Sequence, residues 1–364
     1  MLQRQIAGAA DPRDKLYALY GIFSQVGFQL PEPDYRKSIA DIYKEATVMI
    51  IKHEKSLRIL RLVDGSQGVP GLVSWVPDYR EEARPFAIEY DEQYASKKSR
   101  SRFEFSDDYR QLHLAGQSVD MIRTCSSFHS RQTKYPRDSR EAHFVELIRA
   151  YQDWMRMAQQ LATYPTGENM REVIISTMLQ EHWNVVDNAQ LNELIIERNQ
   201  NWTNIIMAND RTSGIGLDAL DNIINANETR VKKLIEKRKF GSAEHRNALR
   251  ENPAFLRPNP NSTHPEEEKI YKALTLSRNP IWTPVASITQ DATFYVTENG
   301  YVGLGNPACR EGDKIVLVAG ICTPVIMRRE GGFWHFIGHA YIHGMMVREL
   351  WPGDDAELED FTLV

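Results

Sequence analysis

The spacing of apolar and polar positions predicts two amphipathic helices in the first eighty residues. Asp11 is a suitable N-cap and Pro12 a suitable first helical residue, and Gly21 is expected to end this short helix. Asp34 repeats the start signal, and apolar side chains then recur three and four positions apart, at Tyr35, Ile39, Ile42, Tyr43, Ala46, Met49 and Ile50. Each helix is therefore expected to bury one face.

Trp75 stands directly before a Val-Pro-Asp turn. A tryptophan at the end of an element commonly fills the core, because an aromatic ring buries a large apolar surface. We therefore predict that Trp75 has an architectural role, with stacking against a ligand as the alternative.

Alternation of apolar and polar residues predicts strands in two separate parts of the chain. The first pair is 103–105 and 111–123, with Asp107 and Asp108 in the turn between them. The second set follows Trp282 between turns rich in Gly, Asn and Asp, at 293–297, 301–304, 314–319, 323–328, 333–339 and 345–348. Because a sheet must close or cover its edges and the second set is small, we expect the first pair to join it in one β-barrel.

A helical period predominates between these two strand regions. Apolar residues keep that period over 144–161, 173–183, 191–207 and 217–235, and a Pro- and Asn-rich stretch follows at 251–266. The predicted fold class is α+β, with a helical N-terminal segment and a helical middle around a small β-barrel that is discontinuous in sequence. The expected divisions are the mainly helical segment 1–80, barrel-pairing strands 81–128, a helical insertion 140–250, a linker 251–281, the barrel 282–350 and an acidic tail 351–364.

The composition of the 364-residue chain narrows the class of protein. Its formal net charge of −5 argues against a surface that coats nucleic acid. Apolar runs are shorter than the roughly 18–20 residues of a membrane span, and residues 1–10 lack the apolar core of a secretory signal. The widely spaced Cys125, Cys309 and Cys322 are typical of free thiols in a reducing compartment. We therefore expect a cytoplasmic protein that binds no membrane, with a nuclear location as the alternative.

Several segments occur in an order that resembles the fungal heterokaryon incompatibility (HET) proteins. The first, Asp11-Pro-Arg-Asp-Lys-Leu-Tyr-Ala-Leu-Tyr-Gly21, is similar to the segment that closes the family's HET domain. The later ones are Phe105–Tyr109 with Leu112–Asp120, Phe294–Gly305, Glu311–Val318, and the closing segments 324–329, 336–338 and 341–344. The resemblance covers about 1–125 and 280–350. Tyr109 takes the place of a turn glycine, and His339 stands where an acid is common.

This resemblance implies that most of the HET domain would lie upstream of Met1. It also implies structural roles for the residues that carry the matching segments, namely Asp11, Pro12, Arg13, Asp14, Lys15, Tyr17, Gly21, Asp34, Tyr35, Trp75, Pro77, Asp107, Asp108, Gly300, Gly303, Gly305, Gly312, Asp313, Pro324, His343 and Gly344. Among the glycines, we expect Gly300 and Gly312 to serve turns and Gly303 and Gly305 to allow a bulge or tight bend.

The family's role is non-self recognition that leads to programmed cell death when incompatible hyphae fuse. We accordingly interpret this chain as a non-enzymatic interaction and regulatory region that binds a protein partner and holds no cofactor. One alternative is that it is part of a TIR-like, NAD-cleaving enzyme whose catalytic head lies outside these residues.

Motifs for catalysis or cofactor binding are weak in this sequence. The glycines at 300, 303 and 305 precede no helix, so they do not form a phosphate-binding fingerprint. His335, His339 and His343 are four apart and are the candidates for a metal site, with a half-buried structural role as the alternative. A nucleophile motif such as G-x-S-x-G is missing, and the adjacent Asp107 and Asp108 suit a turn better than acid–base chemistry.

One strongly basic stretch offers a different kind of partner. The helix predicted over 217–235 continues into a basic face made of Arg230, Lys232, Lys233, Lys237, Arg238 and Lys239. A solvated helix face is the simplest interpretation, and binding of nucleic acid or an acidic partner is the alternative.

Overall fold

The computed structural model describes residues 11–25, 32–65, 68–80, 95–96, 99–126, 150, 153–179, 292–347, 349–353 and 357–364. The chain divides into two units, one made of Met1–Ser127, Leu161–Val173 and Asp291–Val364, and one made of Phe128–Gln160 and Ile174–Gln290. All of the strands described below belong to the first unit. The second unit is described only at 150, 153–160 and 174–179, where most residues are helical.

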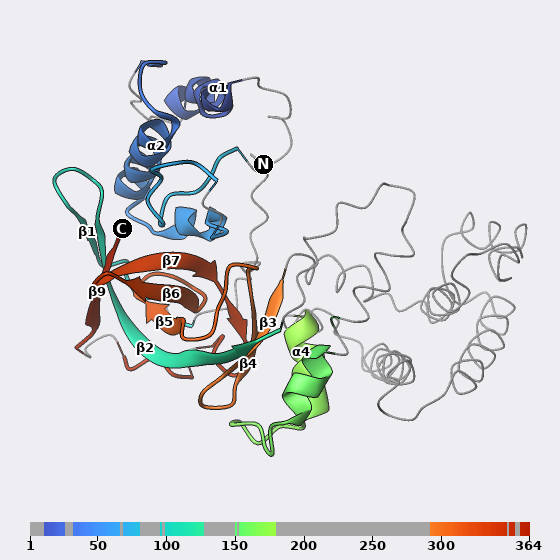
Figure 1. Cartoon of the computed structure of the whole chain (residues 1–364). Coiled ribbons are helices and arrows are strands. Elements are labelled where there is room, and N and C mark those ends of the chain that lie inside the picture. Colours follow the sequence, from blue (N-terminus) through green and yellow to red (C-terminus); the bar gives the residue numbers. More distant parts are fainter. Residues whose placement is uncertain are drawn as a thin grey trace, which may run out of the picture. The chain divides into compact units, whose positions relative to one another are not determined.

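The described strands form one nine-stranded sheet that closes on itself. They are β1 (Phe103–Phe105), β2 (Leu112–Cys125), β3 (Thr293–Thr297), β4 (Val302–Gly305), β5 (Lys314–Val318), β6 (Val325–Glu330), β7 (Phe333–His339), β8 (Tyr341–Ile342) and β9 (Glu359–Leu363). Pairing runs from β5 through β6, β7, β9 and β2 back to β5, and β3, β4 and β8 extend from β2 (Figure 1). The closed ring removes most of the exposed sheet edge.

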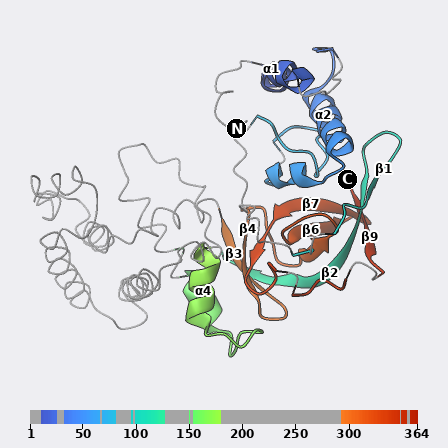
Figure 2. The ribbon, with the colours of Figure 1, turned by 180° about the vertical axis from the view of Figure 1, so that it is seen from behind.

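The long strand β2 connects the two strand regions of the sequence. Its first half pairs with β9 in the register Ala115↔Asp360, and its far end pairs with β3 in the register Ile122↔Thr297 (Figure 2). On its other edge it pairs with β1 and then with β5. The predicted joining of the early strands to the late ones is therefore confirmed.

Two predictions at the end of the chain are wrong. Residues 345–347 form bends instead of a strand, because Gly344 (φ +82°) turns the chain after β8. The segment 351–364 is more than an acidic tail, because Glu359–Leu363 form β9 inside the ring and bury Phe361 and Leu363.

The helices begin with the expected capping chemistry but at different limits. Helix α1 (Pro12–Gln25) passes through Gly21, so the predicted end at that glycine is wrong. Glycine permits a left-handed C-cap without requiring one. Helix α2 (Ile39–Glu54) starts at the N-cap Ser38, whose Oγ accepts the backbone N–H of Asp41 at 3.1 Å. The 3₁₀-helix η1 (Arg58–Leu62) follows, and α4 (Met170–Leu179) lies in the helical region.

The start signal at Asp34 belongs to a turn and not to a helix. Its Oδ1 accepts the backbone N–H of Arg36 at 3.0 Å, and Asp34 itself lies five residues before the first residue of α2. Tyr35 therefore lies outside the amphipathic period and is 52% exposed, which corrects its predicted place on the buried face.

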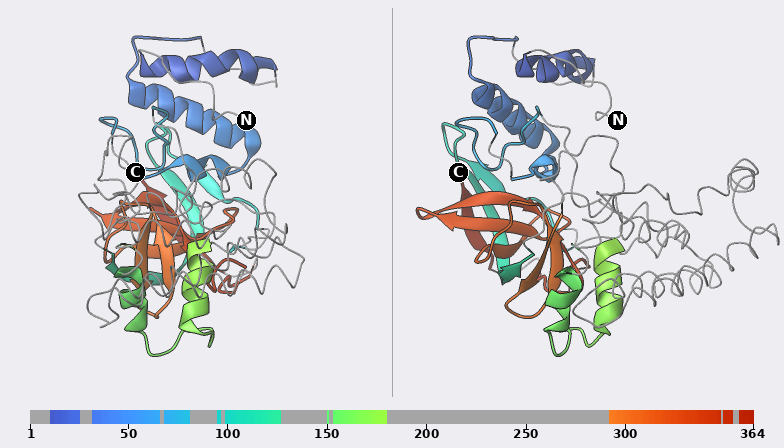
Figure 3. Two further views of the ribbon diagram at one scale, coloured as in Figure 1. Left: turned by 90° about the vertical axis from the view of Figure 1, so that its right-hand side faces the viewer. Right: turned by 45° about the vertical axis from the view of Figure 1, so that its right-hand side comes forward.

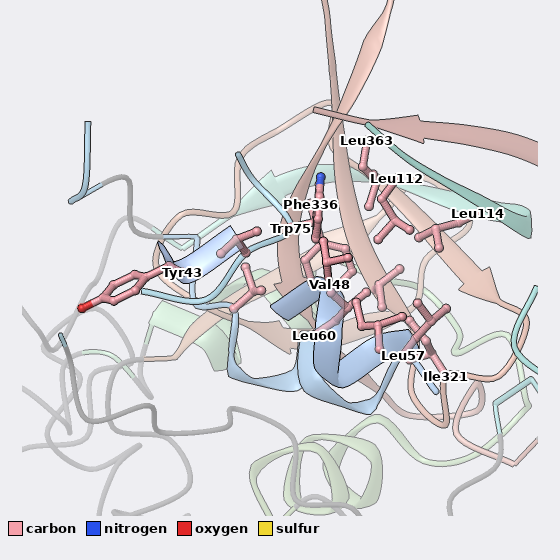
Figure 4. Close-up of a cluster of buried hydrophobic side chains, with 14 of the residues drawn as sticks. Tyr43, Val48, Leu57, Leu60, Trp75, Leu112, Leu114, Ile321, Phe336 and Leu363 are labelled. Carbon is pink, nitrogen blue, oxygen red and sulfur yellow. The ribbon is translucent and has the colours of Figure 1, made fainter. Parts of the chain in front are cut away.

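Helices and barrel share one hydrophobic core. In the described part of the chain, α2 lies between α1 and the barrel (Figures 1 and 3). Figure 4 shows side chains of α2, η1 and the Trp75 loop in contact with side chains of β2, β7 and β9. The residues of this buried cluster include Val48, Leu57, Leu60, Trp75, Leu112, Leu114, Phe336, Phe361 and Leu363. Trp75 is fully buried with its ring centroid 5.7 Å from that of Phe105, which confirms the architectural prediction.

Gly300, Gly303, Gly305 and Gly312, the barrel glycines that carry the resemblance, have two different physical roles. Gly300 (φ +85°) and Gly312 (φ +86°) occupy left-handed turn positions, as predicted. Gly303 and Gly305 lie in the regular β3–β4 ladder, so the predicted bulge is wrong. They are required for close packing instead, since a Cβ on Gly303 would lie 2.7 Å from the Tyr341 carbonyl oxygen, and one on Gly305 would lie 2.5 Å from Cys309 Sγ.

We expect Gly303→Ala to lower the free energy of unfolding by about 1–3 kcal/mol, because the new methyl group overpacks a site bounded by backbone. Urea unfolding followed by circular dichroism would measure this loss. Gly312→Ala is the matched control, since it has no atom within 4 Å of its Cβ position and carries only the left-handed backbone cost. A Gly303→Ala variant as stable as the unsubstituted chain would show that β4 has room to move.

Candidate interaction site

The segment Asp11–Lys15 builds the start of α1 and is the centre of the candidate site. Asp11 Oδ1 accepts the backbone N–H of Arg13 at 2.9 Å, and the Asp11 carbonyl oxygen accepts the N–H of Asp14 at 3.0 Å. Asp11 is therefore the N-cap that the sequence predicts.

The side chains of this segment fasten α1 to the turn at 34–37. The Arg13 guanidinium pairs with the Asp11 carboxylate at 2.7 Å and donates to the carbonyl oxygens of Tyr35 at 2.5 Å and Lys37 at 3.3 Å. The Tyr35 hydroxyl donates in return to Asp14 Oδ1 at 2.5 Å. We call this set, together with Tyr17 and Asp34, the α1 clamp.

Tyr17 completes the clamp from the next turn of α1. Its hydroxyl accepts the backbone N–H of Asp34 and donates to the carbonyl oxygen of the same residue, both at 3.0 Å. Its ring meets those of Tyr20 and Tyr35 edge to face, with centroids 5.1 and 5.2 Å apart. Arg13 lies 5.3 Å from the Tyr35 ring centroid, so cation–π attraction adds to the hydrogen bonds.

A second set of contacts joins α1 to α2, and both helices to residues 78–80. Lys15 Nζ donates to the carbonyl oxygen of Arg80, and the Tyr43 hydroxyl donates to that of Pro12 at 3.1 Å. Arg80 pairs with the buried Asp78 at 2.6 Å. The Tyr79 hydroxyl lies 2.9 Å from Thr47 Oγ1, and burial raises the pKa of Tyr79 to about 12. Both ends of the Asp11–Lys15 segment are thus tied to later parts of the chain.

Two carboxylates of the α1 clamp are paired with arginines, Asp11 with Arg13 of the clamp and Asp34 with the neighbouring Arg36. Hydrogen bonds from the Arg13 side chain lower the pKa of Asp11, and those from Arg36 lower the pKa of Asp34 to about 2. These carboxylates stay ionised and paired near neutral pH, so the network suits structural recognition better than proton transfer.

Asp107 and Asp108 lie in the hairpin turn between β1 and β2, as predicted. Asp108 Oδ1 accepts the Ser106 hydroxyl at 2.8 Å and the backbone N–H of Arg110 at 3.0 Å. Tyr109 adopts φ +55°, the left-handed conformation expected where it replaces a turn glycine. Lys52 lies 4.3 Å from the Tyr109 ring centroid and holds this side chain against α2.

Within the barrel, Asp313 forms a buried ion pair that the motif alone did not reveal. Arg328 on β6 donates to both oxygens of its carboxylate at 2.8 and 2.9 Å, and also to the Ala308 carbonyl oxygen at 2.7 Å. The backbone N–H of Arg310 donates to Asp313 Oδ2 at 2.8 Å. Asp313 therefore anchors the loop before β5 to β6. Pro324 immediately precedes β6.

Thiol chemistry near this pair is suppressed by burial. Desolvation raises the pKa of Cys125 to about 12 and that of Cys309 well above its usual value. Because the thiolate is the nucleophile, these two thiols are not activated.

The three candidate metal-binding histidines do not converge. His335 lies 3.8 Å from Glu330, His339 Nδ1 lies 2.6 Å from the Thr323 hydroxyl, and His343 Nε2 lies 2.9 Å from Glu168. A register shift in the β6–β7 ladder and the turn after β8 break the regular spacing that the sequence suggested. Among the described residues no cluster of three or more His, Cys, Asp or Glu side chains could hold a metal ion.

His343 and Gly344 instead contact the segment 161–173. The Tyr164 hydroxyl donates to the His343 carbonyl oxygen at 2.7 Å, and Thr166 donates to the same Glu168 carboxylate that contacts the imidazole. A Cβ on Gly344 would lie 2.8 Å from Thr166 Cγ2. Both residues therefore serve packing between the barrel and this segment.

The sequence did not reveal the roles of Glu168 and Arg328, because their partners His343 and Asp313 are distant in the chain. The strand β9 did have a signal, the apolar–polar–apolar order of Phe361-Thr-Leu363. The predicted basic face at 230–239 and the linker at 251–281 lie outside the described residues. In the part of the chain that the structure describes, no helix has both the length and the apolar character to cross a membrane.

Comparison with known proteins agrees with the resemblance. Residues 279–364 match the family described as the Het-6 beta-barrel domain. Over 74 residues the chain is 42% identical to "Heterokaryon incompatibility protein 6, OR allele" of Neurospora crassa, a match that covers 19% of this chain and 11% of the relative. No solved structure matches the chain. The matched residues do not include β2, which pairs with four strands of the sheet, namely β1, β3, β5 and β9.

Proposed function

We propose that this chain, whose residues 279–364 match the Het-6 beta-barrel domain, acts as a non-enzymatic interaction and regulatory region of a fungal heterokaryon-incompatibility-type protein. Its role would be in the non-self recognition that leads to programmed cell death. The barrel and the α1 clamp would together present a surface to a protein partner in the cytoplasm.

The observation that carries this proposal is the shared core of the helices and the barrel. Val48, Leu60 and Trp75 pack in the same cluster as Leu114 and Phe336. A change at the barrel would therefore be transmitted to α1 and α2 through packed side chains, which resist continuous deformation. This arrangement suits a rigid regulatory platform.

A role without catalysis is supported by the chemistry of the described residues. The Asp11 and Asp34 carboxylates are paired with arginines, the thiols of Cys125 and Cys309 have raised pKa values, and the three histidines have separate partners. The partner would meet the exposed part of the clamp, where Tyr35 offers an aromatic ring beside the Arg13 guanidinium.

A fungal expression experiment tests the proposed function. One strain would express this chain alone, and another would express it behind a complete HET domain from a related protein. We expect cell death only with the fusion, and we expect Arg13→Ala to weaken it because the contacts from Arg13 to the 34–37 turn are lost. Arg36→Ala is the matched control, since its side chain is 92% exposed and, among the described residues, bonds only to Asp34 in its own turn.

Death from this chain alone would contradict a purely regulatory role. Nicotinamide release by the purified chain in the presence of NAD would favour the enzymatic alternative. Equal effects of Arg13→Ala and Arg36→Ala would remove the α1 clamp from the proposal.

A further inference from the structure

The barrel ring is weakest where β7 meets β9. This junction is parallel and consists of the single residue pair Trp334↔Leu363. The other junctions of the ring contain three to six pairs, with three between β5 and β6 and six between β6 and β7. The closure therefore depends on contacts other than the ladder itself.

One such contact is direct, since the backbone N–H of Val364 donates to the Trp334 carbonyl oxygen on β7 at 3.0 Å, and Ser74, from the loop before Trp75, supplies the others. Its backbone N–H donates to the Val364 carbonyl oxygen at 2.9 Å, and its hydroxyl donates to the same oxygen. Ser74 Oγ in turn accepts the backbone N–H of Phe336 on β7 at 3.0 Å. Ser74, which precedes Trp75 in the helical segment, thus bridges β7 to the residue that follows β9.

The strand β9 is itself anchored in the core that the helices share. Phe361 and Leu363 are buried, and the Phe361 ring centroid lies 5.2 Å from that of Trp334. Glu359 and Asp360 are exposed, although Glu359 Oε1 accepts the backbone N–H of Ser118 at 2.8 Å. If β9 leaves the ring, Ser74 loses the Val364 acceptor, and the Trp75 loop loses two apolar neighbours from the core.

We propose that β9 is a latch that couples the closure of the barrel to the docking of α2. Release of β9 and loosening of the Ser74–Trp75 loop from the barrel form one cooperative opening. The remaining antiparallel ladders of β2, β5, β6 and β7 stay paired during it. The latch is independent of any role in incompatibility, because it is argued from the contacts of Ser74 and from the burial of Phe361 and Leu363 in the shared core.

Native-state hydrogen exchange on the full chain tests the latch. We expect amides of β9, of residues 72–76 and of α2 to open with one common free energy, lower than that of β5 and β6. Ser74→Ala removes the hydroxyl bridge and should speed exchange in all three regions by roughly fivefold, with β5 unchanged. Ser106→Ala is the control, since in the part of the chain that the structure describes its hydroxyl bonds only within the β1–β2 turn.

A reversible cross-link provides the opposite perturbation. His113 and Thr362 lie directly opposite each other in the β2–β9 ladder, and His113 Nδ1 lies 3.0 Å from Thr362 Oγ1. We expect cysteines at both positions, His113→Cys with Thr362→Cys, to form a disulfide. We expect the oxidised variant to slow exchange in β9, residues 72–76 and α2 by the same factor, and reduction to reverse it. Slowing confined to β9, or an α2 as protected as β5 in the unmodified chain, would overturn the latch.

Discussion

Arg328→Met is expected to lower the free energy of unfolding by about 3–5 kcal/mol, because it leaves the carboxylate of Asp313 buried without its guanidinium partner. The Asp313 side chain is only 2% exposed, and among the described residues the Arg310 N–H would be its remaining donor. Urea unfolding followed by circular dichroism would measure the loss.

Two further variants separate this cause from simple loss of volume. Adding Asp313→Asn to Arg328→Met removes the unpaired charge while keeping an acceptor for Arg310, and it should restore much of the lost stability. Arg110→Met breaks an exposed pair with Asp108, whose side chains are 74% and 64% exposed, and should cost less than about 1 kcal/mol. Similar losses for Arg328→Met and Arg110→Met would mean that burial adds little to the pair.

Trp75→Ala is the second large expected effect, with a loss of about 3–5 kcal/mol in the free energy of unfolding. Trp75 is fully buried where η1, β2 and β7 meet, and truncation would leave a cavity between the helices and the barrel. In the part of the chain described, the indole Nε1 has no hydrogen-bond partner, so the loss would come from packing.

Trp75→Phe is the matched control for this packing effect. It keeps an aromatic ring, breaks no hydrogen bond in the described region and should cost less than Trp75→Ala. Phe333→Ala, at a side chain that is 40% exposed, should change stability little. If Trp75→Ala were as mild as Phe333→Ala, the helices and the barrel could not share the core described above.

The sequence predicted strand limits, the first helix cap and turn glycines correctly where neighbouring residues alone determine the conformation. The limits predicted for β1, β3 and β7 agree with the structure, because each is a short apolar run between turn residues. The N-cap at Asp11 and the turn glycines at 300 and 312 were predicted for the same reason. The predicted limits of the two helices were wrong where one residue suits two conformations. Gly21 can end a helix or lie inside one, and Asp34 can cap a helix or a turn.

Non-local contacts explain the other errors. Gly303 and Gly305 appear suited to a bend in the sequence, but Tyr341, Cys309 and Tyr295 crowd them from other elements. The three histidines share a regular spacing in the sequence, yet each finds a partner on a different segment. The acidic residues at 354–360 made the end of the chain look like a tail, although Phe361 and Leu363 follow them and bury their side chains in the core.

The sequence by itself determined the α+β class, most strand positions, the capped start of α1 and the resemblance to the incompatibility proteins, because periodicity, capping and turn chemistry act over a few residues. Only the tertiary structure decided that β9 closes the ring, that Ser74 bridges it to β7, and that Arg328 meets Asp313. Those contacts join residues up to 290 positions apart, and they form only when the packed core brings their backbones together.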